Sequence, residues 1–304
     1  MNYSQILLHQ ILIMFMVIAL GLVCRKANIY QETFVKELGN VLFVVVNPIN
    51  IFKSFIGQYS PVKAKELWIT FALSLLMFVV TIFITRIFFK DDKYCIEHFG
   101  TVICNCGFFG VPVIGAVLGS EAIFYMIPYI VINTIAQFTY GTYVFLKDKK
   151  QMTFKKIIMN TSVIAFILGV IFFYAQIQLP TVVMDCFNGL CDMMGPMCAL
   201  IIGSNLAMTN LKALKEDLST ILVCFIRLIV IPVVAMFVFK FVPCSEVIKY
   251  TLVITLATPS GSSTTVFARN CNKDSYKAAR IVSICTLLTI ITMPMMVKLI
   301  EIIW

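Results

Sequence analysis

The chain has 304 residues, of which 60% are hydrophobic and 13% are charged, and its mean hydropathy is +0.95. A soluble globular protein carries about 25% charged residues, so this composition excludes an ordinary soluble protein. The formal net charge of +9 by itself would suit a nucleic-acid-binding protein. The basic residues follow membrane topology instead, and we expect no nucleic-acid partner.

Ten apolar segments are each long enough to cross a bilayer, which takes roughly 20 residues for about 30 Å of hydrocarbon. The connections between them are short, and no extramembrane domain is left over. The sequence therefore predicts a compact, all-α integral membrane protein with the lipid bilayer as its surroundings. The predicted spans are 5–24, 34–55, 66–89, 97–118, 122–146, 155–177, 181–207, 218–241, 247–268 and 276–302.

The basic residues indicate which loops face the cytoplasm. With the N-terminus outside, 17 of the 24 basic residues fall inside and six fall outside, while Arg227 lies within a span. The positive-inside rule then favours both termini outside. We expect a multi-pass protein of the plasma membrane. The inside set is Arg25, Lys26, Lys36, Arg86, Lys90, Lys93, Lys147, Lys149, Lys150, Lys155, Lys156, Lys212, Lys215, Arg269, Lys273, Lys277 and Arg280.

Three landmarks recur at nearly the same offset in the two halves of the chain. Pro112 and Pro259 are 147 residues apart, Pro48 and Pro196 are 148 apart, and Glu97 and Glu246 are 149 apart. Five spans per half is an odd number, so a duplicated half would have opposite topology. We predict two inverted five-helix repeats, residues 1–150 and 151–304. The alternative is coincidence, because Pro and Gly are common in transmembrane helices.

Spans 4 and 9 each contain a polar cluster that breaks helices, Asn105–Pro112 and Ala257–Ser263. Lipid offers no partner for a freed backbone group, so a broken helix persists only around a protein-lined or wet cavity. We expect the two spans to cross near the midplane at Pro112 and Pro259. Thr258 followed by Pro259 is typical of a helix start, as is Gly110–Pro112. Two helix N-termini facing one cavity would attract a carboxylate.

Five segments resemble the auxin efflux carrier family, which includes bacterial permeases and plant PIN-type carriers. They are Val45–Phe55, Asn105–Pro112, Gly195–Gly203, Ala257–Ser263 and Ala278–Leu288. The resemblance implies a bile-acid-symporter-like elevator, with a scaffold of spans 1, 2, 6 and 7 and a mobile unit of spans 3–5 and 8–10. It also implies an organic anion substrate and is compatible with a homodimer. The long cytosolic loop of many plant members is missing, since only about seven residues from Lys147 separate spans 5 and 6.

The candidate substrate site combines the two breaks with polar residues of spans 2 and 8. Helix–helix packing is the alternative for the small residues, and kink stabilisation is the alternative for the two asparagines of span 2. A buried Arg227 would either attract the anion or pair with a carboxylate. The predicted site residues are Asn47, Asn50, Asn105, Gly107, Gly110, Pro112, Arg227, Thr258, Pro259, Ser260, Gly261, Ser262 and Ser263.

Other polar residues receive weaker assignments. Thr264 and Asn205 would add contacts to the substrate, and a stripe of Asn133, Gln137 and Tyr140 would line the path. Asp185 and Asp192 are either a proton or cation site or solvated positions at a helix end. Glu97 and Glu246 are expected only to favour helix starts. His9 and His98 receive no role, and Cys104 and Cys106 have no Cys/His partners nearby for a metal site.

These features predict a secondary or facilitative carrier for a small organic anion, and the family resemblance implies a carboxylate such as malate, malonate or an auxin-like acid. The chain has no phosphate-binding Walker loop, so direct ATP drive is not expected, and we expect no cofactor. A membrane-embedded enzyme would need a nucleophile or metal motif that the sequence lacks. A transporter-derived sensor, which binds the anion without moving it, is the remaining alternative.

Overall fold

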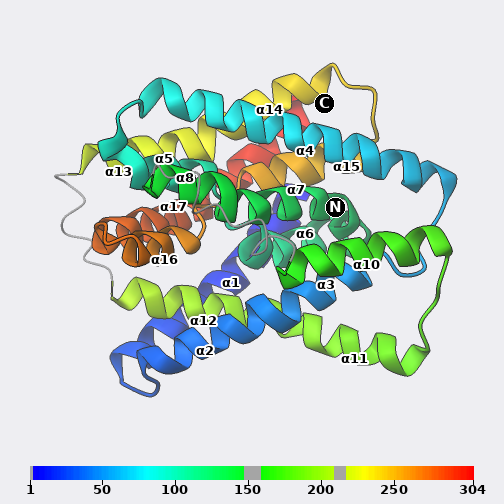
Figure 1. Cartoon of the computed structure of the whole chain (residues 1–304), viewed down its shortest axis with the longest axis horizontal. Coiled ribbons are helices and arrows are strands. Elements are labelled where there is room, and N and C mark those ends of the chain that lie inside the picture. The colour runs from blue at the N-terminus through cyan, green and yellow to red at the C-terminus, as the bar shows by residue number, and fades with distance from the viewer. Residues whose placement is uncertain (1–2, 147–158, 209–216) are drawn as a thin grey trace.

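The computed structural model describes residues 3–146, 159–208 and 217–304, and these residues are folded into helices (Figure 1). Seven of the described helical segments are long and apolar enough to cross a membrane, among them Ile6–Lys26, Pro61–Phe88 and Ser275–Ile303. Predicted spans 4, 6 and 9 consist of shorter helices. The start of span 6 and seven basic residues predicted to be inside, Lys147, Lys149, Lys150, Lys155, Lys156, Lys212 and Lys215, lie outside the described residues.

The helices follow the predicted spans in order, and several spans are divided. Span 1 is α1 (Tyr3–Lys26), span 2 is α2 (Glu32–Val41), η1 (Leu42–Val46) and α3 (Asn47–Lys53), and span 3 is α4 (Pro61–Phe88). After η2 (Asp92–Tyr94), span 4 comprises α5 (Cys95–Val102), η3 (Cys106–Gly110) and α6 (Val111–Leu118). Span 5 comprises α7 (Ser120–Ala136), η4 (Gln137–Gly141) and α8 (Thr142–Leu146). The second half contains α10 (Thr161–Ala175), α11 (Thr181–Asp192), α12 (Met194–Ala207), α13 (Leu218–Phe225), η7 (Ile226–Val230), α14 (Ile231–Lys240), α15 (Glu246–Leu256), α16 (Ser263–Asn270) and α17 (Ser275–Ile303).

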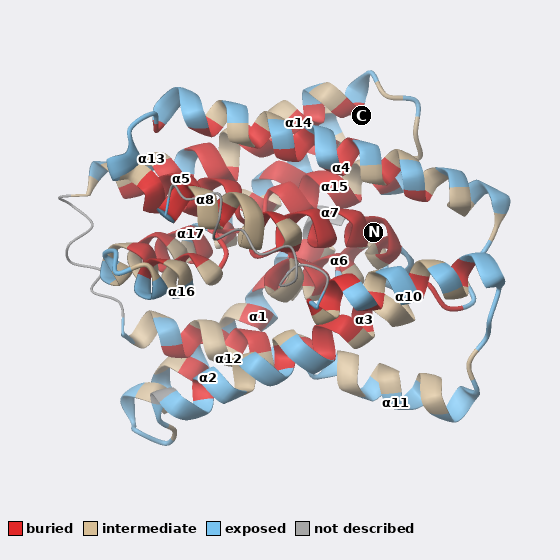
Figure 2. Cartoon of the chain, viewed as in Figure 1, coloured by how far each residue is buried: buried red, intermediate tan, exposed pale blue. Residues whose placement is uncertain are grey.

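The helices form two groups, which also contact each other through the pairs α1–α17 and α1–α6. One group joins α1 to α12 and α3 to α10, and α2 and α11 lie beside it at the lower side of Figure 1. The other group surrounds α7, which packs against α4 and α15, and it includes the pairs α5–α13 and α16–α17. Burial is concentrated on α7 and the helices around it, and many residues of the peripheral helices are exposed (Figure 2). Because exposed residues such as Phe83 and Val182 are large and apolar, they suit a lipid environment rather than water.

Two glycines bring α1 and α12 into backbone contact. A Cβ at Gly21 would lie 2.6 Å from the Leu200 carbonyl oxygen, and a Cβ at Gly203 would be closer still to the carbonyl oxygen of Ile18. Small residues at a helix interface permit this close approach, which strengthens van der Waals packing in a membrane. We call this contact between α1 and α12 the glycine seam.

Spans 4 and 9 are both broken. The predicted break in span 9, Ala257–Ser263, coincides with the observed one, whereas the predicted position in span 4 and the two predicted helix starts need correction. The helix of span 4 stops at Val102 and resumes at Cys106, and Pro112 lies within the continuous run Cys106–Leu118. In span 9 the helix stops at Leu256 and resumes at Ser263. Thr258 and Pro259 therefore lie between helices and do not begin one, and Gly110–Pro112 also begins no helix. Thus Pro112 and Pro259 do not occupy corresponding places, although their spacing suggested that they would.

Candidate functional site

The two breaks meet and bond to each other as a short antiparallel β-bridge between Cys104 and Ser260. The Asn105 N–H donates to the Pro259 carbonyl at 2.8 Å, and the Gly261 N–H donates to the Ile103 carbonyl at 2.9 Å. These bonds occupy backbone groups that the interrupted helices leave unpaired, which buried segments require. The predicted crossing of spans 4 and 9 is therefore present, with Pro259 in it and Pro112 beyond it.

Asn133 of α7 completes the bonding of the crossing. Its side-chain oxygen accepts the Cys104 N–H at 3.2 Å, and its amide nitrogen donates to the Cys104 carbonyl at 3.1 Å. The amide thus acts as a neighbouring strand would. The predicted polar stripe of span 5 is consequently divided, because Asn133 bonds the crossing whereas Tyr140 bonds His98. Asn133 therefore has a structural partner in Cys104.

The breaks divide spans 4 and 9 each into a first and a second half-helix, and the two first half-helices are α5 and α15. Arg227 is fully buried and donates hydrogen bonds at the carbonyl ends of these two helices. It donates to the Thr258 carbonyl at 3.0 Å, to the Leu256 carbonyl at 3.0 Å and to the Thr101 carbonyl at 3.3 Å. Each helix C-terminus carries about half a negative charge, so two of them together balance one guanidinium. These three bonds use three of the five guanidinium N–H donors, no carboxylate pairs with Arg227 among the described residues, and Arg227 is not part of the pocket lining described below.

The second half-helices present their N-termini to a small pocket. Asn105 precedes Cys106–Leu118 and Ser262 precedes α16, and neither side chain caps the helix that follows it. Both residues line a cavity of about 20 Å³ between the crossing, α12 and α17. Such a volume holds about one water molecule. The other lining residues are Phe108, Cys198, Ile201, Ile202, Asn205, Val282, Ser283 and Thr286.

The pocket brings together three predicted polar residues, Asn105, Ser262 and Asn205. Ser283 and Thr286 were missed as site residues. They stand three positions apart on α17, so they share a helix face, and both lie within the Ala278–Leu288 segment that carries the family resemblance. This spacing of two hydroxyl residues was the available signal.

Asn47 and Asn50 of α3 lie beside the crossing but outside the lining of the pocket. Asn47 donates to the Ser162 hydroxyl at 3.1 Å, while its buried side-chain oxygen has no partner among the described residues. A Cβ at Gly107 would lie 3.6 Å from that oxygen. Asn50 contacts the Met194 sulfur at 4.0 Å. An unpaired buried acceptor is costly, so Asn47 is the stronger ligand candidate of the two.

Most of the other predicted site residues serve the crossing itself. Ser260 donates to the Gly100 carbonyl at 2.6 Å, and the Thr258 hydroxyl donates to the Thr255 carbonyl at 2.6 Å. At Gly110, a Cβ would lie 2.5 Å from the Met126 side chain. The structure does not bring Gly107, Gly110, Pro112, Thr258, Pro259, Ser260, Gly261 or Ser263 into the lining of the pocket. Gly110 lies close to the Thr258 side chain of span 9, whereas Pro112 lies against Gly195 of α12.

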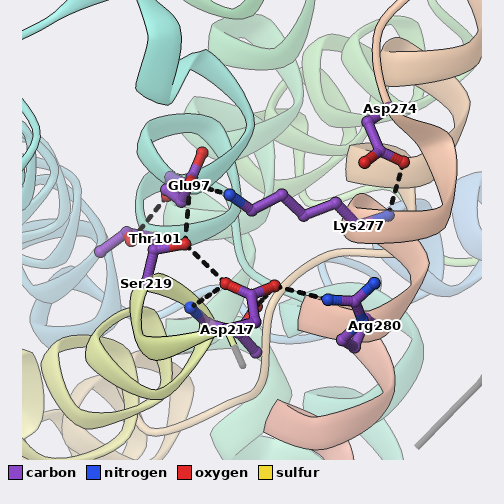
Figure 3. Close-up of polar contacts among 8 residues, drawn as sticks. Glu97, Thr101, Asp217, Ser219, Asp274, Lys277 and Arg280 are labelled. Carbon is purple, nitrogen blue, oxygen red and sulfur yellow. Dashed lines mark hydrogen bonds and ion pairs between the residues drawn. The ribbon is translucent and has the colours of Figure 1, made fainter. Parts of the chain in front are cut away.

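A second polar cluster joins the first turns of α5, α13 and α17 (Figure 3). Glu97, only 1% exposed, pairs with Lys277 at 2.5 Å and accepts the Ser219 hydroxyl at 2.9 Å. Arg280 pairs with Asp217 at 2.8 Å. Glu97 does open a helix as predicted, but its buried ion pair was not foreseen. Since these helix starts meet, all three lie at one end of the molecule, as the predicted topology requires.

The remaining acidic candidates lie apart from the pocket. Asp185 and Asp192 are exposed on α11, which agrees with solvated helix positions. No group of three or more His, Cys, Asp or Glu side chains suited to a metal ion occurs among residues 3–146, 159–208 and 217–304.

A helical protein with several apolar membrane-crossing helices and two broken helices that meet at a buried polar pocket has the features of a membrane transporter. The family described as "Membrane transport protein" matches residues 6–157 and 148–297. The chain therefore belongs to this family, the auxin efflux carrier family, and is a multi-pass membrane transport protein. A search of curated proteins finds no match.

Proposed function

We propose that this chain is a secondary or facilitative carrier that moves a small organic anion across the plasma membrane. A carboxylate such as malate, malonate or an auxin-like acid would bind in the pocket at the crossing of spans 4 and 9. The observation that carries the proposal is the unequal electrostatic compensation of the four half-helix ends. Arg227 bonds the two negative ends, whereas the side chains of Asn105 and Ser262 do not cap the two positive ends beside the pocket.

The positive ends would favour an anion in that pocket. Each helix N-terminus contributes about 0.3–1 kcal/mol of attraction, and up to about 2 kcal/mol where it is partly buried. Two such ends would therefore stabilise a carboxylate by roughly 1–4 kcal/mol without a basic side chain in contact with it. The Asn105 amide and the hydroxyls of Ser262, Ser283 and Thr286 would supply hydrogen bonds.

Transport would require the pocket to open, because about 20 Å³ is too small for a dicarboxylate. We propose an elevator, in which a mobile unit of spans 3–5 and 8–10 slides along a scaffold of spans 1, 2, 6 and 7. The pocket supports this division because α12 of the scaffold forms one wall and the crossing forms another. The unpaired oxygen of Asn47, at the same boundary, would join the site when the mobile unit moves.

The architecture belonging to this proposal is ten spans arranged as two inverted repeats, with both termini outside. The inside location of the ion-paired cluster is supported by its basic members, Lys277 and Arg280. A homodimer, assembled through the scaffold so that each mobile unit remains unhindered, would be compatible with this arrangement.

Uptake into proteoliposomes tests the proposal. Labelled malate, malonate and indole acetate are offered to vesicles containing the purified protein, with and without Na⁺, at two pH values and with an imposed membrane potential. We expect saturable uptake of at least one acid, and Asn105→Ala should weaken it about tenfold. Asn188→Ala on α11, away from the pocket, is the matched control.

The main alternative is a sensor that binds the anion without moving it. Saturable binding in a thermal-shift titration with no flux under any driving force would refute the carrier and favour the sensor. Absence of both binding and flux for every acid tested would remove the organic-anion assignment itself.

A further inference from the structure

A second, larger cavity opens where α4 ends and α5 begins. It has a volume of about 300 Å³, within the range of small-molecule sites. Its walls come from α4, η2, α5, η4 and α8, all in the helix group around α7, so it is separate from the pocket between α12 and α17. The lining residues are Arg86, Phe89, Lys90, Asp91, Asp92, Cys95, His98, Tyr140, Tyr143 and Val144.

The floor of this cavity is a fixed hydrogen-bonded pair. The buried His98 ring contacts the Phe89 carbonyl through Nδ1 at 3.3 Å and the Tyr140 hydroxyl through Nε2. Because a carbonyl only accepts, Nδ1 carries a proton, and the Tyr140 hydroxyl is the hydrogen-bond partner of Nε2. Arg86 belongs to the lining of the same cavity.

The charges of the lining point to a ligand that carries both signs. Arg86 and Lys90 supply two positive charges, and Asp91 and Asp92 supply two negative charges. Asp91 additionally lies 3.5 Å from Lys93. A purely anionic ligand would meet the two carboxylates, and a purely cationic ligand would meet the two basic groups. A group with a phosphate at one end and a protonated amine at the other matches both pairs.

The outer face of α4 leads from this cavity into the membrane. Val79, Phe83 and Ile87 are 55%, 69% and 53% exposed and recur every four residues, so they form one apolar stripe. Arg86 lies at the end of that stripe, at the cytoplasmic end of span 3 in the predicted topology. An acyl chain lying along the stripe would bring its headgroup to Arg86.

From these observations we infer that the cavity is a binding site for a phospholipid whose headgroup joins a phosphate to a primary ammonium, as in phosphatidylethanolamine. Arg86 and Lys90 hold the phosphate, Asp91 and Asp92 accept from the ammonium, and Val79, Phe83 and Ile87 contact an acyl chain. Since every wall of the cavity belongs to the helix group around α7, the bound lipid would travel with that group if the group moves.

The test is lipid titration of the delipidated protein in detergent, followed by thermal shift and by native mass spectrometry. Phosphatidylethanolamine should raise the unfolding temperature and bind at least tenfold more tightly than phosphatidylcholine, whose quaternary ammonium has no N–H to donate. Arg86→Gln and Asp92→Asn should each weaken phosphatidylethanolamine binding about tenfold. Lys26→Gln, an exposed basic residue at the end of α1, should leave it unchanged.

Other results would overturn the inference. Equal binding of phosphatidylcholine would show that the ammonium is not recognised, and stronger binding of phosphatidylglycerol would indicate general attraction of anions. If soluble phosphoethanolamine bound as tightly as the lipid, and Phe83→Ala had no effect on lipid binding, the ligand would be a free metabolite. None of these measurements depends on transport, so a result that refutes the lipid site would not affect the carrier proposal.

Discussion

Replacing Arg227 tests whether one buried guanidinium holds both half-helix ends together. In Arg227→Met, three buried carbonyls lose their donor, those of Thr101, Leu256 and Thr258. A hydrogen bond to a charged group contributes about 1.5–3 kcal/mol, so the gross loss is roughly 5–9 kcal/mol. The mutant no longer has the free-energy cost of burying a charged guanidinium, and this offsets part of the gross loss. We therefore expect a net loss of stability of about 3–5 kcal/mol.

The measurement is the apparent unfolding midpoint of the purified protein in detergent. At about 2–3 °C per kcal/mol for a chain of this size, Arg227→Met should lower the midpoint by roughly 6–15 °C. Arg227→Lys keeps the charge but lacks the planar fork of donors, so it should fall between Met and wild type. Lys298→Met removes the same charge from an exposed position on α17 and serves as the control. A wild-type midpoint in Arg227→Met would refute this reasoning.

Four further changes test other parts of the structure. Asn133→Leu removes both side-chain bonds to Cys104 and should destabilise the protein by about 2–3 kcal/mol, measured as a lower unfolding midpoint; an unchanged midpoint would contradict the bracing role. Pro112→Ala should leave stability and uptake near wild type, because Pro112 lies beyond the break; lost uptake would restore the proline to the crossing. Cys198, alone in an otherwise cysteine-free variant, should react slowly with a thiol reagent and faster when substrate drives opening, and a rate independent of substrate would argue against an opening pocket. Burial alone would raise the pKa of Asp217, but hydrogen bonds from Thr220 and Ser219 outweigh it and hold the pKa below its ordinary value. The stability that Asp217 adds over Asp217→Asn should therefore be complete above about pH 4 and decline as the pH falls further. A stability difference that grew in acid would contradict this assignment.

The sequence predicted the order of the helical segments, the meeting of two breaks and the position of the break in span 9, but not the position of the break in span 4. The order of the helical segments follows from the length of the apolar segments, because a segment in lipid must pair its backbone N–H and C=O groups within a helix. The break in span 4 begins at Ile103, where long-range bonds from Pro259, Gly261 and Asn133 replace helical ones. Pro112 is tolerated inside a helix after a π turn, so local propensity alone placed the break too late.

The charged residues were the least predictable part of the candidate site. Arg227 was recognised as unusual from its depth in span 8, but its partners are carbonyls of two other spans, and carbonyls have no residue-specific signature. Glu97 was expected only to favour a helix start, yet it pairs with a lysine 180 positions away. The hydroxyls of Ser283 and Thr286 belonged to a recognised segment, but their facing toward Asn105 depends on how α17 packs.

The glycine seam between α1 and α12 has a mechanical consequence. With backbone against backbone at Gly21 and Gly203, these helices have no flexible side-chain layer that yields under load, and packed interiors resist compression. The α12 wall of the small pocket is therefore stiff. Any enlargement of the pocket that admits a ligand must come from displacement of the opposite wall, formed by the crossing and α17. A bulky residue in place of Gly203 would instead separate α12 from α1 and displace the α12 wall.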